Sequence, residues 1–120
     1  MSFWKRRHEI RRNKRTRHPS VIYKEKDEKC RSVGLTHAKK TFGKRNLKLR
    51  KNPNPVDKSN SHIVKRVQEQ KKESYGVSYS ERGWALSKRD RVRVDRQIRK
   101  LERKQRIRKN KLKRQKKRKK

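Results

Sequence analysis

The sequence is poor in acidic residues, glycine and cysteine. Asp and Glu account for 11 of its 120 residues and Lys and Arg for 45, so the formal net charge is +34 at pH 7. Its four glycines form no glycine-rich phosphate loop, which argues against nucleotide hydrolysis. Because Cys30 is the single cysteine, no intramolecular disulfide can form, and we expect it to be a small, half-buried strand residue.

Apolar residues are scarce as well. They make up 25% of the chain, whereas globular domains contain roughly 45–50%. The core must therefore be smaller than that of an ordinary domain of this length. No apolar run reaches the length of a signal sequence or a membrane span. We expect a cytoplasmic protein without a membrane partner, or a nuclear or nucleolar protein if the source is eukaryotic.

The positive charge is concentrated towards the end of the sequence. Residues 1–19 carry a net charge of +7, residues 20–82 carry +10, and residues 83–120 carry +17. The middle part is the one whose composition approaches that of a folded domain. We predict a basic N-terminal arm at 1–18, a small β-rich core at 19–86, a helix packed on the core at 87–102 and a basic tail at 103–120, which is disordered or becomes helical when bound.

Short segments rich in β-branched and aromatic residues predict strands in the middle part. Ser20–Tyr23, Cys30–His37 and Asn46–Arg50 have a strand pattern, and Ser61–Val67 is a candidate fourth strand. The polar run Lys24–Lys29 between the first two is typical of a hairpin loop. These segments and the helix after them indicate an α+β fold, with a small SH3-like antiparallel sheet or partial barrel, a basic C-terminal helix and extended basic arms.

The C-terminal helix has a clear start. Ser87 and Asp90 match the Ser-x-x-acid pattern of a helix N-terminus. Val94, Ile98 and Leu101 then follow at spacings of four and three residues, which places them on one narrow apolar stripe. The stripe lapses after Leu101, and like charges four residues apart oppose helix formation there. We therefore expect the helix to pack on the core over its first turns.

So basic a chain needs a polyanionic partner. Thirteen of the last eighteen residues are Lys or Arg and none is acidic, and nucleic acid has one charge per about 1.7 Å of duplex. Basic arms beside a sheet that bears Tyr23, Tyr75 and Tyr79 suit structured RNA better than DNA. The sequence thus predicts a non-enzymatic nucleic-acid-binding protein that neutralises phosphates, as a ribosome-type component of a larger nucleoprotein complex or an accessory protein of a mobile element.

The residues predicted to contact nucleic acid are Lys and Arg side chains of the two arms. They are Arg6, Arg7, Arg11, Arg12, Lys14, Arg15, Arg17, Arg99, Arg103, Lys104, Arg106, Arg108, Lys109, Lys111, Lys113, Arg114, Lys116, Lys117 and Arg118. Such contacts act on the phosphate backbone, so affinity should fall steeply with salt.

We expect neither a metal nor a cofactor. The candidate ligands lack the paired spacing of zinc sites; they are Cys30, His8, His18, His37 and His62. RNA cleavage without a metal requires a base for the 2′-hydroxyl and a cation for the charge that develops on the phosphate. Arg31, Thr36 and His37, near the end of the second predicted strand, are the alternative catalytic residues.

Two segments resemble a known family. Arg17–Tyr23, with a His-Pro pair before a hydrophobic strand, and Arg31–His37 are similar to the opening of PemK/MazF-type proteins. The resemblance implies an SH3-like barrel with an RNA-facing surface and, as in the active toxins, an Arg and Thr pair at a cleavage site, which Arg31 and Thr36 would match. The basic ends also resemble those of ribosomal RNA-binding proteins in general. Two alternatives stay open: a metal-independent endoribonuclease of toxin type, and an inhibitor that occupies a nucleoprotein machine.

Overall fold

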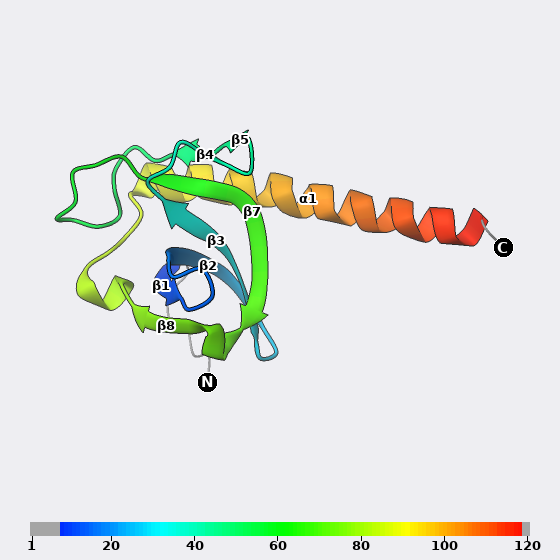
Figure 1. Cartoon of the computed structure of the whole chain (residues 1–120), viewed down its shortest axis with the longest axis horizontal. Coiled ribbons are helices and arrows are strands. Elements are labelled where there is room, and N and C mark those ends of the chain that lie inside the picture. The colour runs from blue at the N-terminus through cyan, green and yellow to red at the C-terminus, as the bar shows by residue number, and fades with distance from the viewer. Residues whose placement is uncertain (1–7, 119–120) are drawn as a thin grey trace.

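The structure, a computed structural model, describes residues 8–118, with side chains as far as residue 114, and contains one main sheet and one long helix (Figure 1). The sheet has six strands in the order β6-β7-β3-β2-β1-β8, paired antiparallel, and it is not closed. Its strands are β1 (Glu9–Asn13), β2 (Pro19–Lys26), β3 (Lys29–Thr36), β6 (Leu47–Lys48), β7 (His62–Lys71) and β8 (Tyr75–Ser78). The other elements are the small hairpin of β4 (Lys40–Thr41) and β5 (Lys44–Arg45), the 3-10 helices η1 (Lys72–Ser74) and η2 (Ser80–Arg82), and the helix α1 (Lys88–Arg118). The predicted α+β class, an antiparallel sheet followed by a C-terminal helix, is confirmed.

The first hairpin is tighter than the sequence predicts. The run Lys24–Lys29 is not a loop, because β2 continues to Lys26 and β3 begins at Lys29. The turn therefore consists of Asp27 and Glu28, and Asp27 has a φ of 56°, a left-handed conformation that Asp tolerates better than most residues. Strand pairing persists among these polar residues, and Cys30 of β3 pairs with Glu25 of β2. Cys30 was expected to be half-buried, but its side chain is fully buried.

Part of the predicted N-terminal arm belongs to the sheet. Glu9–Asn13 forms β1, which pairs with β2 and β8, and Ile10 is fully buried in the core. Asn13 donates a hydrogen bond of 3.1 Å to Gln68 of β7, although two strands separate β1 from β7 in the sheet order, so the sheet curls on itself. One apolar residue among cations was too weak a pattern to predict this strand. Residues 1–7 of the predicted arm lie outside the described residues.

The main core lies between the sheet and α1. Its buried apolar side chains come from the sheet, from α1 and from the segments beside them: Ile10, Val21, Val33, Leu35, Leu49, Ile63, Leu86, Val94 and Ile98. Complete burial of one such side chain contributes about 1.5–3 kcal/mol. Leu101 is partly buried against this cluster, so the apolar stripe predicted for the helix is confirmed.

The helix extends further than the sequence predicts. α1 has 31 residues, a length of about 46 Å. It continues through residues 103–118 of the basic tail, which the charge pattern predicts to be disordered or to become helical when bound. The first turns of α1 are already held on the sheet, so the costly nucleation of the helix is complete. Each residue added after them, through the segment 103–118, then contributes one backbone hydrogen bond. Lys, Arg and Gln are also good helix formers, and cations are favourable near a helix C-terminus. Figure 1 shows this part of α1 projecting past β7.

Candidate nucleic-acid interface

Glu102 of α1 is the centre of a network that joins the helix to the sheet. Its carboxylate accepts a hydrogen bond of 2.5 Å from the hydroxyl of Tyr23 in β2 and a second one from Arg31 in β3. Arg31 also donates from Nε to Glu69 of β7 at 2.9 Å. Burial pushes the pKa of Glu102 upward, but hydrogen bonds from Arg31 and Tyr23 outweigh it and hold that pKa below its ordinary value. The Glu102 and Glu69 carboxylates raise the pKa of Arg31 in turn, so the network stays ionised at neutral pH.

The two other carboxylates of α1 are also bonded to the body of the protein. Asp95 lies 2.6 Å from Nε2 of His8. Asp90 is fully buried, and its oxygens accept hydrogen bonds of 3.0 and 3.1 Å from the backbone N–H groups of Arg50 and Lys51. All three acidic residues of α1 therefore hold the helix on the sheet and its loops. No acidic residue follows Glu102 among the cations of the projecting part.

The predicted contacts on α1 are exposed as far as side chains are described. These exposed residues are Arg99, Arg103, Lys104, Arg106, Arg108, Lys109, Lys111, Lys113 and Arg114. Lys116, Lys117 and Arg118 belong to the helix, but their side chains lie outside the described part. The structure thus places a dense set of exposed cations on one continuous helix.

The nucleic-acid contacts predicted near the N-terminus are divided among three environments. Arg6 and Arg7 are outside the described residues. Arg11 belongs to the fold, because it donates to the carbonyl of Gly76 at 3.1 Å and lies 3.2 Å from the Glu9 carboxylate. The remaining four are exposed on β1 and the turn after it: Arg12, Lys14, Arg15 and Arg17. They form a second basic surface, at the β1–β2 end of the sheet.

Two grooves flank α1 between residues 97 and 109, and Gln105 lines both of them. The hairpin groove, between α1 and the β2–β3 turn, has a volume of about 1000 Å³. Its lining includes eight cations and four carboxylates: Lys24, Lys26, Lys29, Arg31, Lys71, Arg99, Arg106 and Lys109, with Asp27, Glu28, Glu69 and Glu102. The carboxylates offset half of that positive charge.

The second groove lies between α1, β7 and the β4–β5 hairpin, and we name it the Phe42 groove. Its volume is about 380 Å³. Five cations and no carboxylate occur among the described residues that line it: Lys44, Lys65, Arg66, Lys104 and Arg108. An anion entering this groove therefore meets positive charge alone, which makes it the better phosphate site of the two.

The three tyrosines that were expected to lie on the RNA-facing side of the sheet do not form an exposed aromatic surface. Tyr23 is bonded to α1, Tyr75 is buried with its hydroxyl 2.7 Å from a serine hydroxyl, and Tyr79 stacks on Trp84 with ring centroids 4.5 Å apart. These three rings therefore belong to the fold: Tyr23 and Tyr75 from strands β2 and β8, and Tyr79 from the residue that precedes η2. Among the residues that the structure describes, the exposed aromatic ring is instead Phe42, in the Phe42 groove.

Sequence reasoning missed Phe42 and its neighbour Arg66. The guanidinium carbon of Arg66 lies 5.1 Å from the centroid of the Phe42 ring. The two residues lie on different elements, the β4–β5 turn and β7, so no local pattern connects them. The available signal was the Phe-Gly pair between short runs of Lys, Thr and Arg, which marks an aromatic residue at the tip of a basic hairpin.

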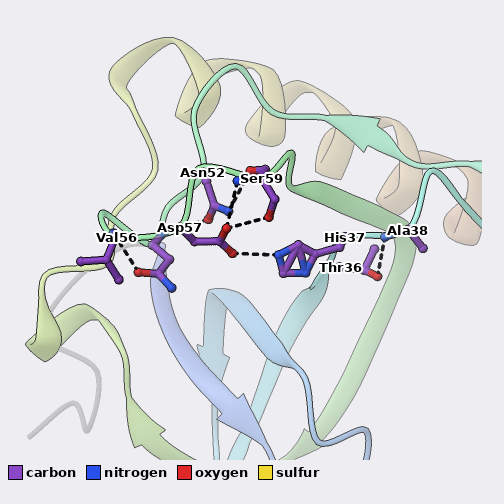
Figure 2. Close-up of polar contacts among 8 residues, drawn as sticks. Thr36, His37, Ala38, Asn52, Val56, Asp57 and Ser59 are labelled. Carbon is purple, nitrogen blue, oxygen red and sulfur yellow. Dashed lines mark hydrogen bonds and ion pairs between the residues drawn. The ribbon is translucent and has the colours of Figure 1, made fainter.

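The alternative catalytic residues do not come together. Arg31 and Thr36 lie in the same strand, five residues or about 16 Å apart. Arg31 is engaged with Glu69 and Glu102, whereas the hydroxyl of Thr36 accepts a hydrogen bond of 3.1 Å from the backbone N–H of Ala38 (Figure 2). Arg31 and Thr36 are therefore too far apart to contact the same phosphate.

His37 has a different partner, which the sequence did not indicate. Its Nε2 lies 2.9 Å from the carboxylate of Asp57, as Figure 2 shows. Ser59 donates hydrogen bonds to Asp57 from its hydroxyl at 2.7 Å and its backbone N–H at 2.9 Å, and these lower the pKa of Asp57. The His37 side chain is 66% exposed, so this contact is a surface ion pair that ties the loop after β6 to the end of β3.

No three His, Cys, Asp or Glu side chains of the described residues are grouped so that they could hold a metal ion. Within the same residues, no helix combines the length and the apolar composition that a membrane span needs. Comparisons of the chain with models of protein families, with curated proteins and with solved structures gave no match.

Proposed function

We propose that this protein binds nucleic acid, RNA in preference to DNA, without cleaving it, and that α1 makes the main phosphate contacts. The observation that carries the proposal is the separation of charge on α1. Its cations from Arg99 to Arg114 are exposed, while its three carboxylates are bonded to the body of the protein. The helix therefore presents a positive surface with no internal counter-charge beyond Glu102.

The charge density of α1 supports a polyanionic partner. Residues 99–114 carry ten exposed Lys or Arg side chains. These residues span about 24 Å, which is about one cation per 2.4 Å, close to the one charge per about 1.7 Å of a nucleic-acid duplex. Such cations repel one another within the Debye length of about 8 Å at physiological salt. A phosphate backbone removes this repulsion and releases its own counterions on binding.

The arrangement of the cations favours RNA. They occur on all sides of the projecting helix rather than on one face, so they suit contacts with backbone and shape better than the reading of bases in a DNA major groove. Part of the same proposal is that the curled sheet is a partial SH3-like barrel and that the protein acts in the cytoplasm within a larger nucleoprotein assembly. The Asn13–Gln68 contact supports the barrel-like curl.

The cleavage hypothesis has less support. It requires an arginine and a threonine at one phosphate, but Arg31 is held by Glu69 and Glu102 at a distance from Thr36. His37 is paired with Asp57 and would need an unidentified acid beside it. We therefore propose binding alone.

The proposal is tested with two variants that lose the same number of positive charges at different places. In the tail variant, Gln replaces five exposed cations of α1 outside the Phe42 groove: Arg103, Lys109, Lys111, Lys113 and Arg114. In the control variant, Gln replaces five exposed cations near the start of α1 and on loops: Lys51, Lys58, Arg82, Lys88 and Arg89. Gln has nearly the helix propensity of Lys and Arg, so α1 is retained.

Affinity for a labelled RNA hairpin is then measured by fluorescence anisotropy between about 50 and 200 mM salt. We expect the slope of log affinity against log salt to fall in magnitude by about 3.5–4.5 in the tail variant, because each lost phosphate contact removes about 0.7–0.9. The control variant should lose much less. Equal slopes in both variants, or no binding by the native protein, would contradict the proposal.

A further inference from the structure

Phe42 occupies a position that the fold does not favour. It is 75% exposed at the tip of the β4–β5 hairpin. Its φ is 52° and that of the following Gly43 is 74°, so both central residues of the turn are left-handed. Asn-Gly is the pair that such a turn prefers, and a bulky side chain at its first position is strained. Exposure and strain thus fall on the same residue, which points to a role outside folding.

The ring is held in place by a cation. Arg66, which is exposed on β7, has its guanidinium carbon 5.1 Å from the centroid of the Phe42 ring. Arg66 covers part of the ring, but three-quarters of the side chain remains open to solvent. The pair therefore presents a planar apolar surface beside a planar cation, and both of these groups stack on nucleic-acid bases.

The surroundings of this pair suit one nucleotide. The Phe42 groove has a volume of about 380 Å³, within the range of pockets that hold small ligands. Lys104 and Arg108 reach it from α1, and Lys44 and Lys65 from the strands. Because Lys104 and Arg108 belong to the exposed cations of α1 that are proposed to bind phosphates, a strand bound along that side of α1 passes this groove. Gln97 adds an amide group to the lining, which can hydrogen-bond the edge of a base. The amide nitrogen of Asn46, in contrast, already donates to the carbonyl of Ala38 and the hydroxyl of Thr41.

We infer that the Phe42 groove binds one unpaired base of RNA, stacked on Phe42 beside Arg66, while its neighbouring phosphates contact Lys104 and Arg108. The inference rests on the proposed function and adds a substrate class to it. A base within a duplex has both faces covered by its neighbours, whereas a base in a loop or bulge can turn outward and stack on an aromatic side chain. The preferred ligand is therefore RNA with an unpaired nucleotide next to a stem.

The experiment compares a hairpin RNA that carries one 2-aminopurine in its loop with a fully paired duplex of the same stem. Stacking quenches 2-aminopurine, so its fluorescence reports the base, whereas anisotropy reports total binding. We expect the native protein to quench the loop base and to prefer the hairpin. Phe42→Asn should abolish the quenching and weaken hairpin binding by about 5- to 150-fold, the effect of losing one stacked base, while duplex binding is unchanged.

Controls separate this inference from the general one. Val56→Asn changes an exposed apolar residue, 86% exposed, outside the groove and should have no effect. Phe42→Tyr keeps the ring and should retain the quenching, and Phe42→Leu keeps apolar bulk without a ring and should lose it. Phe42→Asn should melt at the same or a higher temperature than the native protein, because Asn fits the turn.

The outcomes are distinguishable. If neither RNA binds, the proposed function fails. If both RNAs bind equally, or if Phe42→Leu quenches as the native protein does, the groove is not a base site although the helix still binds phosphates. A lower melting temperature for Phe42→Asn, with quenching retained in Phe42→Leu, would assign Phe42 to the fold and overturn the inference.

Discussion

Tyr23 in β2 donates a hydrogen bond of 2.5 Å to Glu102 in α1, and so links two residues 79 positions apart in the chain. The bond lies where α1 leaves the sheet, because Leu101 is the last apolar residue of the helix that packs on the core. Together with Arg31, which donates to the same carboxylate, this contact sets the direction in which the cationic part of the helix projects.

Replacement of Tyr23 with Phe removes the hydroxyl and keeps the ring. We expect the free energy of unfolding to fall by about 1–2 kcal/mol, because a hydrogen bond to a charged but partly exposed carboxylate is lost. Urea denaturation followed by circular dichroism measures this change. In a Glu102→Gln background the same substitution should cost less, and an equal loss in both backgrounds would show that the two residues are not coupled.

Replacement of Asp90 with Ala should destabilise the protein more strongly. The buried carboxylate accepts hydrogen bonds from the backbone N–H groups of Arg50 and Lys51, which would be left unpaired. We expect a loss of about 2–4 kcal/mol, since both the charged acceptor and its partners are affected. Thermal unfolding provides the measurement, with Glu81→Ala, an exposed acidic residue, as the control. A change in melting temperature no larger than that of the control would contradict the role of Asp90.

The free energy of unfolding should decrease as the pH falls below about 6.5, which is the ordinary pKa of a histidine side chain. Burial, together with the charge of nearby Lys48, lowers the pKa of His62 in the folded state. Between that lowered value and 6.5 the unfolded chain binds the proton and the folded protein does not. The free energy of unfolding therefore falls there by at most about 1.4 kcal/mol per pH unit.

The contribution of His62 is measured as the difference between the native protein and His62→Gln from pH 5 to 8, because the other histidines are common to both. The variant should show a flatter pH profile. Glu69 and Glu102, whose pKa values are lowered, stabilise the fold above their ordinary pKa of about 4.3, and that stability is lost as the pH falls through their folded values, at lower pH. Parallel profiles for the two proteins would contradict the assignment to His62.

RNA incubated with the protein in the presence of a chelator should remain intact. The structure separates Arg31 from Thr36 along β3, so these two residues do not form the Arg and Thr pair that a toxin-type cleavage site implies. Denaturing gel electrophoresis of an end-labelled RNA detects any discrete cut. Cuts that disappear in Thr36→Ala and in His37→Ala would establish the endoribonuclease in place of simple binding.

Local patterns in the sequence predicted much of the fold. The β-branched and alternating residues of β2, β3 and β7 indicate strands because a strand repeats every two residues. Ser87 predicted the start of α1, and its hydroxyl does accept a hydrogen bond of 3.2 Å from the backbone N–H of Asp90. The carboxylate of Asp90 does not complete the capping box, since it bonds to the backbone at Arg50 and Lys51 instead. That choice depends on a loop 40 residues away.

The candidate site was also predicted only in part, because it depends on contacts between residues that are distant in the sequence. Net charge is additive, so a value of +34 in 120 residues requires no knowledge of the fold, and neither does the expectation of a polyanionic partner. Whether a given cation is exposed or paired depends on which distant segment it meets: Arg31 is tied to Glu69 and Glu102, whereas Arg108 is exposed beside Phe42. The Phe42 groove forms because the β4–β5 hairpin, β7 and α1 pack side by side. These elements are far apart in the chain, so no local pattern in the sequence predicts that they are neighbours.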